Sequence, residues 1–208
     1  MTKHLTILFL LVLSSPLHAA LVSSDYLTPG DNLITRDTVT GLEWLDLTVT
    51  QGLSPDAVQS NPVFSAQGFR YALTSDVSTL FQNAGITITS NDPVSGQINE
   101  VTALINLLGA TTVLPDGRLI SEGYYHPFVT PDGGLKGDWV YKTELSLLDD
   151  TLYFAAITRG EASLQSYANP QFGNLLVRPV PLPAAIWLFA AGLTGLVGIS
   201  RRNKKTAA

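Results

Sequence analysis

The chain has 208 residues, no cysteine and a formal net charge of −5. Between Ala20 and Val180, seven basic residues stand against all 17 acidic residues, so this stretch carries a net charge of −10. Such a surface repels nucleic acid and anionic lipid, and the absence of cysteine excludes disulfides, thiolate metal sites and cysteine nucleophiles.

Residues 1–19 predict an export signal. Lys3 precedes the apolar stretch Leu5–Leu13, which is followed by a proline and several small residues. This order is typical of a secretory signal peptide, and the apolar run is too short to span a membrane. We expect cleavage after Ala19, with Ala20 as the second choice, by a signal peptidase after passage through the Sec translocon. A buried N-terminal strand is the alternative.

The predicted exported globular domain comprises residues 20–179. A short strand is expected at Leu33–Thr35, followed by a turn at Asp37–Gly41 and an alternating strand at Leu42–Leu47. Ser54 should cap a short helix, because a proline follows it at the first helical position.

Two amphipathic helices follow. A strand-like run at Phe69–Leu73 leads into a helix that we expect Thr74 or Ser75 to cap and Gly85 to end. A second helix should begin at residue 98 and end at Gly109. Their apolar stripes are Val77, Leu80 and Phe81 in the first and Val101, Leu104, Ile105 and Leu108 in the second.

The rest of the domain predicts short strands and turns. The segments Val113–Tyr125 and Val129–Tyr141 align at a 16-residue offset, and each contains a Pro-Asp-Gly turn. We interpret them as paired hairpins, followed by strands at Thr151–Arg159 and Gly173–Val180. The order of elements predicts an α+β fold with a mostly antiparallel sheet and two or three short helices.

Three stretches carry a resemblance to a known group. They are "DTVTGLEWLD" (residues 37–46), "GFRYALTSDVSTL" (residues 68–80) and "LLVR" (residues 175–178). This pattern resembles a bacterial surface-domain family with "TGLMW", "GWRLPT" and "YVRCV"-like pieces. The resemblance implies the fold shared by C-type lectins and formylglycine-generating enzymes. The chain lacks the cysteines and the "WND"-type calcium motif of true lectins, so lectin activity does not carry over.

Residues 180–205 form a distinct C-terminal segment. Ala184–Ser200 carries no charge over 17 residues, which as a helix gives about 25 Å at ~1.5 Å per residue. We therefore predict a membrane helix at about residues 183–200, with a buried core helix as the alternative. The basic residues that follow it would hold the C-terminus in the cytoplasm. They are Arg201, Arg202, Lys204 and Lys205.

The start of this segment resembles the PEP-CTERM sorting signal in its VPLPA variant. The motif consists of Val180, Pro181, Leu182, Pro183 and Ala184. The resemblance implies recognition by an exosortase, a membrane-embedded cysteine protease or transpeptidase of Gram-negative bacteria that make extracellular polysaccharide. We thus expect transit through the inner membrane and delivery to the cell surface or the extracellular matrix. A plain single-pass membrane anchor is the alternative.

Catalytic signals in the predicted mature protein are few. His126 is its one remaining histidine, so a Ser-His-Asp triad would have to use it. A half-buried histidine among aromatic residues is the simpler interpretation. Zinc-site, P-loop and dinucleotide motifs are absent. We predict a non-catalytic binding or structural role in an exopolysaccharide or biofilm context, with an Asp/Glu-dependent polysaccharide hydrolase as the rival.

Two sets of side chains could contact ligands. Sugar rings stack on aromatic faces, so an extracellular polysaccharide could contact aromatic residues of the hairpins, which are also good sheet-core residues. These residues are Tyr124, Tyr125, Trp139 and Tyr141, with Phe128 nearby. No cofactor is predicted, although oxygen ligands on turns could hold a structural calcium ion instead of capping backbone groups. These ligands come from Asn91, Asp92, Glu122, Asp138, Asp149 and Asp150.

Overall fold

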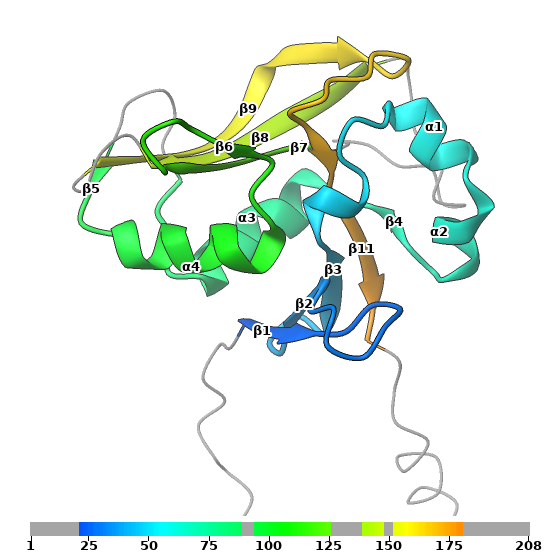
Figure 1. Cartoon of the computed structure of the whole chain (residues 1–208), viewed down its shortest axis with the longest axis horizontal. Coiled ribbons are helices and arrows are strands. Elements are labelled where there is room, and N and C mark those ends of the chain that lie inside the picture. Colours follow the sequence, from blue (N-terminus) through cyan, green and yellow to red (C-terminus); the bar gives the residue numbers. More distant parts are fainter. Residues whose placement is uncertain (1–20, 89–93, 126–138, 148–151, 181–208) are drawn as a thin grey trace, which may run out of the picture.

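The computed structural model describes residues 21–88, 94–125, 139–147 and 152–180. Within these residues the chain forms two mainly antiparallel sheets with helices packed on them (Figure 1). The predicted α+β class is confirmed. The predicted signal peptide and C-terminal segment, except for Val180, lie outside the described residues.

The first sheet has five strands in the order β1-β2-β3-β11-β4, all paired antiparallel. They are β1 (Leu21–Ser24), β2 (Ile34–Asp37), β3 (Leu42–Leu45), β11 (Leu176–Pro179) and β4 (Arg70–Tyr71). Leu21 pairs with Asp37, Asp37 with Leu42, and Leu42 with Pro179. One row of the sheet therefore contains both the first described residue and the last residue of β11.

The second sheet is built from the middle of the chain, in the order β10-β7-β8-β9-β5, with β6 paired to β7. The strands are β5 (Val94–Ser95), β6 (Thr112–Val113), β7 (Leu119–Tyr125), β8 (Trp139–Leu147), β9 (Leu152–Leu164) and β10 (Gly173–Asn174). The pair β10–β7 is parallel and the others are antiparallel. The expected single sheet is thus two sheets in the described part of the chain.

Four α-helices and one 3-10 helix are described, where two or three helices were predicted. They are η1 (Leu47–Val49), α1 (Pro55–Ser60), α2 (Pro62–Ala66), α3 (Thr74–Asn83) and α4 (Ile98–Leu108). Ser54 caps α1 as predicted, because its hydroxyl accepts the N–H of Ala57 at 3.2 Å. The additional helix α2 begins at a proline as well, and Asn61 caps it by accepting the N–H of Val63.

Two sequence-based expectations require correction. Neither Thr74 nor Ser75 caps α3; its N-cap is Leu73, because the Asp76 carboxylate accepts the Leu73 N–H at 2.8 Å. The last predicted strand, residues 173–180, is divided between β10 and β11 at Leu175.

Among the described residues, no helix is both long enough and apolar enough to cross a bilayer. The helix predicted at about residues 183–200 lies outside them.

The main core lies between the two sheets. Helix α4 contacts β7, β8 and β9 of one sheet and β1 and β2 of the other (Figure 1). Its predicted apolar stripe is buried there together with Trp44 of β3 and Val177 of β11. A second cluster, which includes Val58 of α1 and Phe64 of α2, packs around Ile34, Leu45 and Leu176. The first sheet is therefore covered on both faces.

Leu47 of η1 joins the two sheets at a pair of glycines. Gly173 of β10 and Gly123 of β7 are register partners, and Leu47 lies against both. A methyl group added at Gly173 would overlap the Leu47 carbonyl oxygen and lie 2.8 Å from its Cβ and 2.9 Å from its carbonyl carbon. A methyl group at Gly123 would lie 2.7 Å from the Leu47 Cδ2. A methyl group would therefore push against the backbone of η1 at Gly173 and against the Leu47 side chain at Gly123.

Candidate functional site

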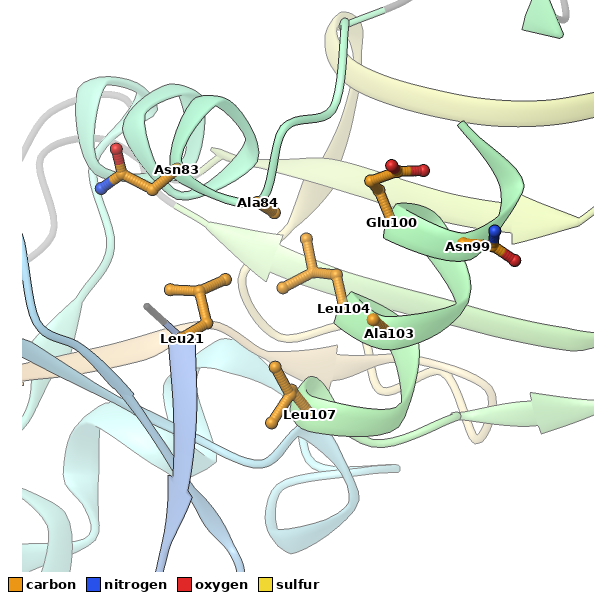
Figure 2. Close-up of a pocket in the computed structure, with 8 residues that line it drawn as sticks. All are labelled: Leu21, Asn83, Ala84, Asn99, Glu100, Ala103, Leu104 and Leu107. Atoms are coloured by element: carbon orange, nitrogen blue, oxygen red, sulfur yellow. The ribbon is translucent and has the colours of Figure 1, made fainter. Parts of the chain in front are cut away.

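A groove lies where β1, the end of α3 and one flank of α4 meet (Figure 2). Its volume is about 340 Å³, which is at the lower end of small-molecule sites, roughly 300–1,000 Å³. The lining residues are Leu21, Asn83, Ala84, Asn99, Glu100, Ala103, Leu104 and Leu107. Figure 2 shows the side chains of Leu21, Leu104 and Leu107 directed toward one another, with Asn83 and Glu100 farther out.

Asp37 fixes one side of the groove. Its carboxylate accepts the side-chain N–H of Asn83 at 2.7 Å and the backbone N–H groups of Val39 and Thr40 at 2.8 and 3.2 Å. Asp37 also pairs with Leu21 across the sheet. Because Asp37 is 1% exposed, these contacts hold the end of α3 and the start of β1 together.

Gln97 fixes the other side, where α4 begins. Its side-chain amide donates to the carbonyl oxygen of Gly85 at 2.5 Å and accepts the N–H of Thr87 at 2.9 Å. Gly85 ends α3 with a φ of 76°, a conformation that glycine adopts without strain. The ends of α3 and α4 are thus tied together next to Glu100.

The lining residues provide an apolar floor with a few polar groups at its edge. Glu100 is the one titratable side chain among them, and Asn83 and Asn99 add two amides. General acid–base hydrolysis of a glycosidic bond normally uses two carboxyl groups. The described lining supplies one carboxyl group, two amides and an apolar floor, a composition that suits a ligand with an apolar group and hydrogen-bonding groups.

The structure places two of the predicted ligand-contacting tyrosines in the interior. Tyr124 is 1% exposed and Tyr125 is 0% exposed. The Tyr124 ring lies 5.1 Å from the Phe172 ring between centroids, while Tyr125 belongs to the main core. The two tyrosines therefore present no face to a sugar, and the sheet-core interpretation holds for them.

The other predicted aromatic contacts are only partly described. Trp139 and Tyr141 lie in β8, where Tyr141 pairs with Tyr125, but their side chains lie outside the described ones, as does Phe128. Of the aromatic cluster, the described residues show the buried Tyr124 and Tyr125 and the backbone pairing of Tyr125 with Tyr141.

Of the candidate calcium ligands, Glu122 is the one that the structure describes, and it does not line the groove. Glu122 lies in β7 opposite Glu144, and the other five candidates lie outside the described residues, as does His126. No group of three or more His, Asp or Glu side chains able to hold a metal ion occurs within the described ranges.

Of the predicted sorting motif, Val180 is the one described residue. Its N–H donates to the carbonyl oxygen of Gly41 at 2.8 Å, directly after β11 ends. Pro181, Leu182, Pro183 and Ala184 lie outside the described residues, as do Arg201, Arg202, Lys204 and Lys205.

Comparison with known proteins finds no matching family model, no matching curated protein and no matching solved structure.

A charged cluster lies on three adjacent strands close to Val180. Arg36 of β2 donates through Nε and Nη2 to the Glu43 Oε1 at 3.2 and 2.7 Å, and Arg178 of β11 donates through Nε to Oε2 at 2.8 Å. The Arg178 guanidinium also lies 4.6 Å from the centroid of the Phe69 ring. Two guanidinium groups thus share one carboxylate, which gives the cluster a net positive charge.

The groove was not predicted from the sequence, although α4 carries one signal for it. Leu107 is apolar but lies outside the stripe of residues 101, 104, 105 and 108 that faces the core. A second apolar flank on an amphipathic helix indicates a second contact or a binding surface.

Proposed function

We propose that the chain is an exported cell-surface or extracellular-matrix protein of a Gram-negative bacterium. The motif Val180–Ala184 and the helix predicted at about residues 183–200 would present it to an exosortase-type enzyme. The described domain would have a non-catalytic binding role in an exopolysaccharide or biofilm context.

The observation that carries this proposal is the junction of the fold with the motif. The backbone is paired to the sheet through Pro179, and Val180 is bonded to Gly41. The last described residue of the domain is therefore the first residue of the proposed sorting motif. The prolines of that motif have no backbone N–H to donate to a sheet, which supports the proposal that a processing enzyme can bind it.

The binding role rests on the groove of Figure 2. It combines an apolar floor, two amides and one carboxylate on rigid helices, which is the usual composition of a binding site for a small ligand or a segment of a polymer.

The sorting proposal is tested by the intact mass of the protein from cells with and without the suspected sorting enzyme. We expect the mature protein to lose the basic tail, Arg201 to Ala208, only when the enzyme is present. A Pro181→Ala/Pro183→Ala variant should remain unprocessed, whereas Pro170→Ala is the matched control and should be processed normally. If the tail is retained in all strains, the helix is a plain anchor.

The binding role is tested by filling the groove. Ala103→Trp places a large ring among the lining residues, and Asn106→Trp places the same ring on an exposed position of α4 outside the groove. We expect retention of the protein by exopolysaccharide purified from the producing cells to fall for Ala103→Trp alone. Equal retention of both variants would exclude the groove as the binding site.

A further inference from the structure

We propose that one end of the domain, formed by the turn Asp37–Gly41 and the end of β11, lies on the lipid headgroups while the chain is anchored. We call this the sheet-end surface, and its occupant is the phosphate layer of the bilayer. The inference rests on the anchoring helix of the proposed function and adds an interaction surface to it.

The backbone between the fold and the predicted helix is short. Val180 is fixed by its hydrogen bond to Gly41, and the helix is predicted to begin at about residue 183. This connection spans no more than about 10 Å, at ~3.4 Å per residue. The sheet-end surface must therefore lie within that distance of the start of the helix.

The connection is only slightly longer than the headgroup layer of the bilayer is thick. The headgroup layer is about 5–8 Å thick on each side of a hydrocarbon core of ~30 Å. The uncharged run Ala184–Ser200 gives a helix of only about 25 Å, so its first residues are drawn to the edge of the hydrocarbon. Crossing the headgroup layer takes up most of the backbone between Val180 and residue 183. The domain therefore lies on the headgroups.

The sheet-end surface differs in charge from the domain as a whole. Its turn exposes Thr38, Val39 and Thr40, and Val39 is 47% exposed. The two acids nearby, Asp37 and Glu43, are 1% and 3% exposed. Although residues 20–180 carry a charge of −10, the described strands and turn at this end expose no carboxylate to the membrane.

The cluster of Arg36, Glu43 and Arg178 lies next to the sheet-end surface. Arg36 donates through Nε and Nη2 to the Glu43 carboxylate, and 39% of its side chain is still exposed. Arg178 lies two residues before Val180, so this positive cluster is close to the exit of the chain. Guanidinium groups bind phosphate oxygens with good geometry. Arg36 therefore supplies the contact to lipid phosphate.

The absence of cysteine allows a direct test with the full chain. Val39→Cys and, as the distant control, Asp116→Cys at the turn between β6 and β7 are each labelled with a fluorophore. The chain is inserted into vesicles of phosphatidylcholine mixed equally with phosphatidylglycerol that carry a nitroxide on the lipid headgroup. We expect several-fold stronger quenching at Val39→Cys than at Asp116→Cys. Thr40→Cys repeats the measurement at a neighbouring exposed position.

Two changes should weaken the quenching at Val39→Cys. Arg36→Gln removes the phosphate contact. Arg118→Gln is the control and should have no effect, because Arg118 is a partly exposed arginine in the turn between β6 and β7. A flexible Gly/Ser spacer inserted after Val180 should reduce quenching to the level of Asp116→Cys.

Flotation of the same vesicles separates the two proposals. If the chain floats with the vesicles but Val39→Cys and Thr40→Cys are quenched no more than Asp116→Cys, the sheet-end surface does not contact lipid and the anchor stands. If the spacer leaves quenching unchanged, the short connection is not the cause and the inference fails. If the chain does not float, the anchoring helix and the inference both fail.

Discussion

The contact between Leu47 and the glycine pair of the second sheet leads to a quantitative prediction. Gly173→Ala places a methyl group against the backbone of Leu47, with its carbonyl oxygen, carbonyl carbon and Cβ all too close. Backbone cannot move aside as a side-chain end can, so η1 must separate from β10. Overpacking a core costs about 1–3 kcal/mol and occasionally more. We expect a loss at or above about 3 kcal/mol for this variant.

Gly123→Ala is the matched control on the partner strand. Its methyl group would meet the Leu47 Cδ2 at 2.7 Å and the Leu175 Cγ at 3.2 Å, and both atoms belong to side chains. Because these can change rotamer, we expect a smaller loss of about 1–2 kcal/mol. Both losses are measured by urea unfolding of the full chain in detergent, followed by tryptophan fluorescence.

A double-mutant cycle with Leu47→Ala separates the two mechanisms. Leu47→Ala alone should cost about 2–5 kcal/mol as a buried truncation. It removes the Cδ2 that opposes Gly123→Ala but keeps the backbone and Cβ that oppose Gly173→Ala. We therefore expect favourable coupling with Gly123→Ala and none with Gly173→Ala. Favourable coupling with both, or equal losses for the two single glycine variants, would refute the assignment of the clash to backbone.

Three further variants test other parts of the fold. Glu43→Gln should lower the free energy of unfolding by about 2–3 kcal/mol, because two guanidinium groups lose their shared carboxylate and one stays partly in water; a loss within the error of urea unfolding would contradict this. Four backbone N–H groups lower the Asp31 pKa from 3.8 to about 2. The ionised Asp31 therefore stabilises the fold above its unfolded pKa, and this contribution to the free energy of unfolding is lost as pH falls toward 2. Asp31→Asn should flatten that acid-side fall in thermal unfolding, and parallel curves for wild type and variant would argue against it. Tyr71→Phe should cost about 1–3 kcal/mol in urea unfolding, because the buried Asn174 Oδ1 loses a 2.7 Å hydrogen bond, and a neutral effect would mean that another donor replaces it.

The local elements could be predicted because their signals act over a few residues. Ser54 followed by proline set the start of α1, and the three- and four-residue spacing of apolar residues set α4. Gly109 ends α4 with a φ of 85°, as expected of a terminating glycine. The first Pro-Asp-Gly turn is also confirmed, since the Gly117 N–H donates to the Leu114 carbonyl oxygen at 2.9 Å.

The cap of α3 and the burial of β7 depend on groups that a local sequence pattern does not reveal. The cap of α3 was expected to be a hydroxyl, but the Asp76 carboxylate accepts the Leu73 N–H and also pairs with Arg70 at 2.7 Å. Tyr124 and Tyr125 point to opposite faces of β7, and both are buried because Phe172 covers one face and the main core covers the other. Periodicity within a strand cannot show that both of its faces are covered.

The groove could not be predicted for a similar reason. Its walls come from β1, from the end of α3 and from one flank of α4, and β1 is distant in sequence from both helices. No spacing rule relates Leu21 to Leu104, because their contact depends on how the sheet and helices pack. In the sequence, Leu107 alone, the apolar residue outside the core stripe of α4, indicated a second contact or a binding surface on this helix.

The position of β11 has a consequence for the order of folding. This last strand lies between β3 and β4, and Arg178 joins Glu43 across 135 positions of the chain. A chain synthesised from its N-terminus holds β1, β2 and β3 long before it holds the strand that connects them to β4. The first sheet cannot close until nearly all of the domain has emerged, and contacts of such high sequence separation form slowly. Until then the backbone groups along the edge of β3 are unpaired. The unfinished chain must therefore be kept from pairing with neighbouring chains through this edge.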